Sequence, residues 1–286
     1  MNLTEEIVKK AKELLEGKTV DCFIGYERAT DGMSARPLFV YELQEADKLI
    51  FDQTCTHNLA KYLLNRKNKV TGIVVKPCDS RAINLLLSEH QIERNKVVII
   101  GVVCPGIVET GWNKTSKKLQ VSCELCQQHT PLIYDYLVGE PPASETETEP
   151  YADIAGIEKK SAEEKRAFWK EQFNRCIRCY ACRQVCPGCY CSECFVERLD
   201  PLWVGIRIAP DENDLWNTMR AFHLAGRCIG CYQCERVCPM NIPLSLLNRK
   251  LEKEVLGLFN FQAGIDSETP APLSTFDKDE KIGIGE

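Results

Sequence analysis

The stretch VTGIVVKPCDSRAINLLLSEHQIERNKVVIIGVV occupies residues 70–103 and predicts a strand, a helix and a second strand. VTGIVV (70–75) and KVVIIGVV (96–103) are continuous apolar runs, and SRAINLLLSEH (80–90) between them has the pattern of an amphipathic helix. Continuous apolar strands joined by such a helix are typical of a parallel βαβ crossover. The predicted fold class of this part of the chain is therefore α/β.

The residues before this unit extend the same pattern. Ile7, Ala11 and Leu14 share one face of a predicted N-terminal helix that Thr4 would cap and that Gly17 would follow. VDCFIGY (20–26) then predicts another strand. We therefore expect residues 1–138 to form an α/β domain built on a parallel sheet.

The rest of the chain divides into three predicted regions. Residues 139–162 are rich in Pro, Glu and Thr, which favours a linker or a strap that faces a partner. Residues 163–256 carry helical patterns around cysteine clusters and predict a mainly helical, ferredoxin-like dicluster domain. Residues 257–286 show no core periodicity, so we expect a tail that is loose or ordered only against another subunit.

Composition limits the functional class. The chain has 286 residues, a net charge of -5 and an isoelectric point near 5.6, which argue against a nucleic-acid partner. Its longest apolar run, 97–104, is too short to cross a bilayer, and the charged N-terminus does not resemble a signal peptide. We therefore expect a cytoplasmic protein with no direct membrane insertion. In that reducing compartment, its seventeen cysteines predict metal ligands rather than disulfides.

Two copies of one cysteine motif, C-x2-C-x2-C-x3-C-P, lie in the second half of the chain. This is the bacterial ferredoxin spacing, in which the fourth cysteine of each copy binds the cluster of the other copy. It predicts two [4Fe–4S] clusters, one held by Cys176, Cys179, Cys182 and Cys238 and the other by Cys228, Cys231, Cys234 and Cys186. Zinc is the alternative, but structural zinc sites use paired C-x2-C knuckles instead.

Further cysteines predict a third site near the α/β sheet. Cys78 and Cys104 follow two parallel strands at their carboxyl ends, the edge where open α/β sheets bind ligands. Asp79 or Ser80 would cap the helix after Cys78, and Lys76 and Asp79 are the predicted cofactor-binding side chains of this turn. A metal-ligand pair and one further cysteine complete the pool, from which four of five would hold a third [4Fe–4S] cluster or a zinc ion: Cys55, Cys78, Cys104, Cys123 and Cys126.

Cys189, Cys191 and Cys194 supply three ligands of a possible fourth cluster, whose fourth ligand would come from the N-terminal pool. Alternative ligands or inert thiols are the competing interpretations. Cys22 lies in an apolar strand and is expected to be a buried structural thiol. No nucleotide-binding glycine motif, catalytic histidine pair or carboxylate pair is present, so no catalytic residue is predicted.

Several of these stretches resemble a known family. VTGIVVKPCDSRAINLL, KVVIIGVVCPG and CTHNLAKYL are similar to segments of the beta subunits of deazaflavin-reducing hydrogenases and dehydrogenases, including formate dehydrogenases. AGRCIGCYQCERVCPMNIPLSLLNRKL resembles the dicluster domains of hydrogenase, sulfite reductase and heterodisulfide reductase electron-transfer subunits. The resemblance implies an α/β domain that holds FAD beside an iron–sulfur cluster, with Cys78 and Cys104 at the positions of the family's cysteines.

Three functions follow, in this order. The first is an iron–sulfur electron-transfer subunit of an anaerobic redox complex, which passes single electrons between other subunits. The second is a flavin-containing beta subunit that itself reduces a nicotinamide, a deazaflavin or another small acceptor. The third is a zinc-stabilised scaffold without redox chemistry.

Overall fold

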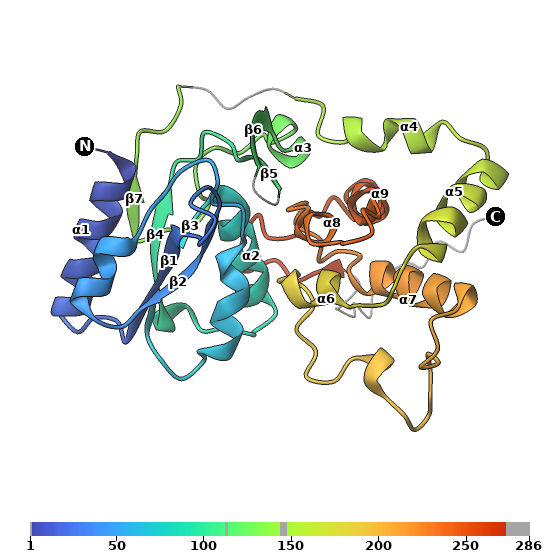
Figure 1. Ribbon diagram of the computed structural model, residues 1–286, viewed down its shortest axis with the longest axis horizontal. Helices are drawn as coiled ribbons and strands as arrows, with labels where there is room; N and C mark the ends of the chain where they lie inside the picture. Colours follow the sequence, from blue (N-terminus) through green and yellow to red (C-terminus); the bar gives the residue numbers. More distant parts are fainter. Residues whose placement is uncertain (1, 112–113, 144–147, 273–286) are drawn as a thin grey trace.

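The computed structural model describes residues 2–111, 114–143 and 148–272 of the chain (Figure 1). A five-stranded sheet in the order β2-β1-β3-β4-β7 organises the first half. Its strands are β1 (Cys22–Arg28), β2 (Ala35–Val40), β3 (Thr71–Val75), β4 (Val97–Val102) and β7 (Tyr136–Val138). β1, β3, β4 and β7 run parallel, so the predicted α/β class is confirmed.

The sheet is mixed rather than wholly parallel, which corrects one expectation. β2 runs antiparallel to β1, and the turn between them is closed by Asp31, whose carboxylate accepts hydrogen bonds from the backbone of Met33 and Ser34 at 2.9 Å. Residues 29–34 are too few for a crossover connection, which needs a dozen or more residues. The hairpin therefore adds an antiparallel edge strand.

Helices α1 (Leu3–Glu16) and α2 (Pro77–Ser88) lie on opposite sides of the sheet (Figure 1). α1 buries Ile7, Ala11 and Leu14, as its pattern predicts. Its N-cap is Asn2 rather than Thr4. The Thr4 hydroxyl instead accepts a hydrogen bond from the backbone of Phe51 at 2.9 Å, so this side chain ties the helix to a loop.

α2 begins earlier than predicted, at Pro77. Proline is favoured in the first turn of a helix because it has no N–H that would need a partner there. Asp79 is therefore the third residue of the helix, and its carboxylate accepts from the backbone N–H of Lys76 at 3.1 Å. The remaining elements of this half are short: η1 (Leu43–Lys48), η2 (Leu59–Asn65), η3 (Arg94–Lys96), β5 (Val108–Gly111), β6 (Lys114–Leu119) and α3 (Val121–Glu124).

The second half is helical, and residues 148–272 contain none of the strands of the described chain. Its elements are η4 (Ala152–Ile154), α4 (Ala155–Glu158), α5 (Ala162–Asn174), α6 (Ala181–Val185), η5 (Phe195–Glu197), α7 (Pro210–His223), α8 (Gln233–Arg236) and α9 (Leu244–Phe259). α6 and α8 each follow a tyrosine with left-handed backbone, Tyr180 at φ 58° and Tyr232 at φ 54°. The repeat of the sequence is thus also a repeat of the backbone.

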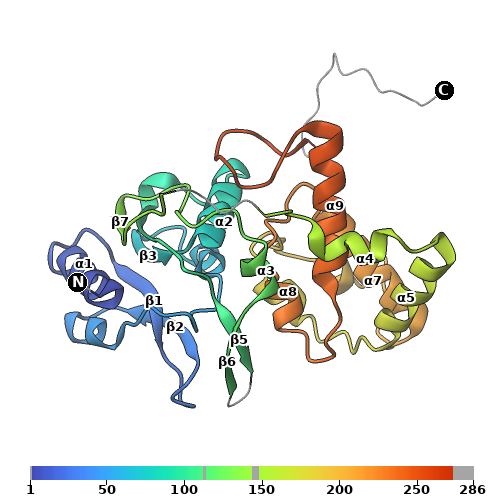
Figure 2. The same ribbon diagram turned by 90° about the horizontal axis from the view of Figure 1, so that it is seen from above.

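Hydrogen bonds and an ion pair fasten the two halves together, with α2 between the sheet and the helical half (Figure 2). Lys61 donates to the carbonyl of Cys189 at 2.6 Å, and Gln233 donates to the carbonyl of Thr56 at 2.7 Å. Glu89 of the segment after α2 pairs with Arg227 at 2.5 Å. The cysteine motifs of the second half are thereby held against the α/β half.

Two segments that looked irregular in the sequence are packed. In the region predicted as a linker, Tyr151, Ile154 and Ile157 are buried and form a small apolar cluster that includes side chains of α9. Beyond α9, the carbonyls of Ala263 and Gly264 accept hydrogen bonds from α2. The part of the expected loose tail up to residue 272 is thus ordered against its own chain, and residues 273–286 lie outside the described residues.

No helix among the described residues combines the length and the apolar character needed to cross a bilayer.

Candidate metal centres

The cysteines gather around four cavities. The sheet-edge cavity is lined by Cys78, Cys104, Cys123 and Cys126. The two ferredoxin motifs form the Cys176 cavity, lined by Cys176, Cys179, Cys182 and Cys238, and the Cys228 cavity, lined by Cys228, Cys231, Cys234 and Cys186. The three-cysteine cavity is lined by Cys189, Cys191 and Cys194. The last cysteine of each ferredoxin motif therefore lies beside the first three of the other motif.

The sheet-edge cavity lies where β3 and β4 end. Cys78 is the second residue of α2, Cys104 follows β4, and Cys123 and Cys126 come from α3 and the loop after it. The Cys123 sulfur accepts from the backbone N–H of Ile107 at 3.2 Å. Burial raises the pKa of the Cys104 thiol to about 12. Deprotonated ligands at this site therefore require a bound cation, which a metal centre supplies.

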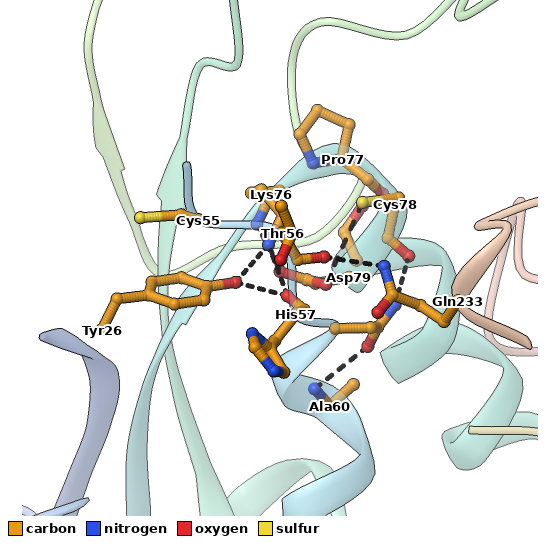
Figure 3. Close-up of polar contacts among 12 residues, drawn as sticks. Tyr26, Cys55, Thr56, His57, Ala60, Lys76, Pro77, Cys78, Asp79 and Gln233 are labelled. Atoms are coloured by element: carbon orange, nitrogen blue, oxygen red, sulfur yellow. Dashed lines mark hydrogen bonds and ion pairs between the residues drawn. The ribbon is translucent and has the colours of Figure 1, made fainter. Parts of the chain in front are cut away.

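Two cysteines of the N-terminal half lie away from this cavity. Cys55 is fully buried, accepts from the backbone N–H of Asp52 at 3.4 Å, and points its sulfur away from Cys78 (Figure 3). Cys22 is fully buried in β1, which confirms the predicted structural thiol. Of the five cysteines in the N-terminal pool, the structure thus brings four together and separates Cys55 from them.

Lys76 and Asp79, the predicted cofactor-binding residues, bind one another instead. The Lys76 ammonium lies 2.9 Å from the Asp79 carboxylate, with side chains 1% and 0% exposed (Figure 3). It also donates to the carbonyl of His57 at 2.8 Å and to the hydroxyl of Tyr26. Burial disfavours the ammonium, yet Asp79 and Tyr26 keep the pKa of Lys76 above its ordinary value. Of the two residues, Lys76 lines the sheet-edge cavity, as a fixed positive charge.

The three-cysteine cavity differs from its expected composition. Its walls come from the helical half alone, so no cysteine of the N-terminal pool supplies a fourth sulfur there. Cys189 lies against Cys186, and the hydrogen bond between them lowers the pKa of Cys186 to about 6. Because Cys186 lines the Cys228 cavity, this contact places the two cavities next to each other.

All four cavities form one row through shared walls. The sheet-edge and Cys228 cavities share Ile229, Gly230, Cys231 and Gln233. The Cys228 and three-cysteine cavities share Gly188, Leu224 and Arg227, and the three-cysteine and Cys176 cavities share Trp216. The walls are largely apolar side chains, which keep water away from the cysteines.

Two side chains of α7 that the sequence analysis did not single out belong to this row. Arg220 is 4% exposed and donates to the carbonyl of Cys182 at 3.0 Å, while its buried Nε has no hydrogen-bond partner among the described residues. Both Arg220 and His223 line the three-cysteine cavity. The available signal was an Arg and a His three residues apart on a helix that leads into the second cysteine motif.

The spacing of the cysteines bears on the kind of centre. Within the described ranges, no group of three or more His, Cys, Asp or Glu side chains is placed to hold a single metal ion. The cysteines instead surround cavities, and a cubane presents its four irons at separate corners.

An α/β half with cysteines beyond its strands, joined to a helical half with the doubled ferredoxin motif, resembles the beta subunits of deazaflavin-reducing hydrogenases and dehydrogenases. Comparison with known proteins confirms this resemblance. The chain is 24% identical to the "F420-dependent formate dehydrogenase subunit beta" of Methanocaldococcus jannaschii, over 93% of both proteins. It is 30% identical to the "F420-dependent formate dehydrogenase 1 subunit beta" of Methanococcus maripaludis, over 37% of this chain and 26% of that protein. No family model matches the chain.

Proposed function

We propose that this chain is an iron–sulfur electron-transfer subunit of a cytoplasmic oxidoreductase complex of the hydrogenase, formate dehydrogenase or heterodisulfide reductase type. Relatives named as formate dehydrogenase beta subunits support the complex, and the row of cysteine-lined cavities supports the electron path. The proposal keeps the predicted division into an α/β domain (1–138), a linker (139–162), a dicluster domain (163–256) and a tail.

The donor chemistry of three cavities fits [4Fe–4S] clusters. Each of these cavities offers four cysteine sulfurs, the number of thiolates that such a cluster binds. Bound clusters would supply one-electron oxidation and reduction. The ligands would be the four cysteines of the sheet-edge, Cys176 and Cys228 cavities.

The chain's own residues would separate and tune these centres. Gln233 stands between the sheet-edge and Cys228 cavities, held by its hydrogen bond to Thr56 (Figure 3). Lys76 at the sheet edge and Arg220 in the helical half are buried cations, which offset the negative charge of thiolate-bound clusters and so raise their reduction potentials.

A neighbouring apolar segment supports docking of another subunit of the complex. Between η5 and α7, the side chains of Leu199, Leu202, Trp203, Ile206 and Ile208 are all exposed, with Ile206 83% exposed. Exposed apolar groups of this density mark interaction sites. Arg178, which lines the Cys176 cavity, donates to the carbonyl of Gly205 at 2.6 Å and so anchors the segment. A subunit bound there would exchange electrons through the Cys176 site.

The flavin-containing beta subunit is the second candidate, and the names of the relatives favour it, because they are F420-dependent enzymes. The sheet-edge cavity measures about 90 Å³. Pockets for organic ligands measure roughly 300–1,000 Å³, so this cavity suits an inorganic centre better than FAD. Acid release of a flavin in amounts equal to the protein would reverse this order.

The deciding experiment measures iron, acid-labile sulfide and zinc per chain after purification without oxygen. Three filled cavities predict about 12 of each of iron and sulfide, and four predict about 16. Cys179→Ala should remove about four irons and slow electron transfer between partners, whereas Cys22→Ala, in a buried position away from the cavities, should remove none. Zinc without iron in the unaltered protein would refute the proposal and favour the scaffold.

A further inference from the structure

The three-cysteine cavity has one more side chain able to bind a metal. Besides Cys189, Cys191 and Cys194, its lining residues include His223, the last residue of α7. Cys186 is the nearest other sulfur, but it lines the Cys228 cavity, which would be left with three cysteines if Cys186 were used here. Imidazole is an established substitute for cysteine on iron–sulfur clusters.

The position of the imidazole is set by the same segment that carries the cysteines. The His223 ring packs edge-on against Phe195, with ring centroids 5.2 Å apart and planes at 80°. Phe195 directly follows Cys194 at the start of η5. The ring is therefore held on the cysteine loop although its backbone belongs to a helix.

A buried donor beside the cavity indicates an anionic occupant. Arg220 lies one helical turn before His223, is 4% exposed, and has an Nε without a partner among the described residues. A buried donor of this kind costs free energy unless an acceptor satisfies it. A cluster that carries three thiolates is negatively charged and provides sulfur acceptors at that place.

We propose that Cys189, Cys191, Cys194 and His223 hold a fourth [4Fe–4S] cluster. This inference rests on the proposed function, since it extends the same row of centres. A neutral imidazole in place of a thiolate raises the reduction potential of an iron–sulfur centre, as it does in Rieske proteins, and the Arg220 cation acts in the same direction. The site next to the Cys228 cavity thus takes one electron from the centre there, which is oxidised by one electron.

The test uses the full-length protein purified without oxygen and reduced with dithionite. Iron and sulfide analysis gives the number of clusters, and pulsed EPR detects nitrogen bound to a reduced cluster. The variants are His223→Ala, which removes the ligand, and His223→Cys, which replaces it with a thiolate. The control is His90→Asn, since His90 lies in a turn with φ 54°, a conformation that Asn tolerates.

The expected wild-type protein has about 16 irons and a nitrogen coupling, and His90→Asn keeps both. His223→Ala should lose the coupling together with between about one and four irons, and His223→Cys should keep the iron, lose the coupling and lower the potential of one centre. An unchanged coupling in His223→Ala overturns the inference. A wild-type count of about 12 irons without nitrogen coupling also overturns it but leaves the proposed function standing, whereas a protein without iron ends both.

Discussion

The buried ion pair of Lys76 and Asp79 allows a sharp test of how burial sets the strength of an interaction. The pair is 2.9 Å apart and almost wholly inside the protein. Lys12 and Asp47 form a closer pair, at 2.6 Å, but their side chains are 38% and 63% exposed. The same substitution, Lys→Met, can therefore be made in both pairs.

The two variants should differ several-fold in stability. At 2.9 Å and an effective dielectric constant of 20, the attraction in the buried pair is about 6 kcal/mol. Removing one partner of such a pair costs about 3–5 kcal/mol of unfolding free energy, because an unpaired charge stays buried. Lys12→Met should cost less than about 1 kcal/mol, since water and salt screen the exposed pair.

The assay is thermal unfolding followed by circular dichroism, on anaerobic samples matched for iron content. With about 2–4 °C per kcal/mol for a chain near this size, Lys76→Met should lower the midpoint by roughly 6–20 °C and Lys12→Met by less than about 4 °C. Asp79→Asn should resemble Lys76→Met, and the double variant should recover part of the loss. Equal midpoints for the two lysine variants would refute the reasoning.

Three further outcomes are expected. Cys126→Ala should remove about four irons per chain, whereas Cys55→Ala, which lies off the cavity, should remove none and cost about 1–2 kcal/mol; iron loss in both would return Cys55 to the ligand set. Burial lowers the pKa of His57 to about 4, from an ordinary value of 6.5, so its contribution to stability is present above pH 6.5 and is lost as the pH falls toward 4. That loss reaches about 2 kcal/mol at pH 5, and unfolding curves of His57→Gln should show less of it. Gly264→Ala should loosen the segment after α9, because φ is 75° and the new methyl would meet the Arg81 carbonyl oxygen, and faster proteolysis there is the measurement.

The strands of the βαβ unit could be predicted because burial on both faces leaves a continuous apolar run. The runs 70–75 and 96–103 contain β3 and β4 almost residue for residue. The start of α2 was misplaced, because Asp79 was taken as an N-cap although Pro77 already has the backbone angle of a first helical turn. The segment beyond α9 has no apolar period, since its carbonyls are bound by Arg81 and Asn84.

The cysteine sites divide in the same way. Spacing alone placed Cys238 with the first ferredoxin motif and Cys186 with the second, and the cavities have this composition. Spacing could not show that Cys55 points away from its neighbours, since it carries no information on the direction of a side chain. Nor could it reveal the contact of Lys76 with Tyr26, because fifty residues separate the two side chains.

The exchange of cysteines between the two ferredoxin motifs has a consequence for the order of biosynthesis. The Cys176 cavity includes Cys238, and the Cys228 cavity includes Cys186, so neither can close until the ribosome has passed residue 238. The four cysteines of the sheet-edge cavity have all been synthesised by residue 126. A nascent chain therefore presents the sheet-edge thiols long before the others, and an assembly factor that delivers iron and sulfide would meet that site first.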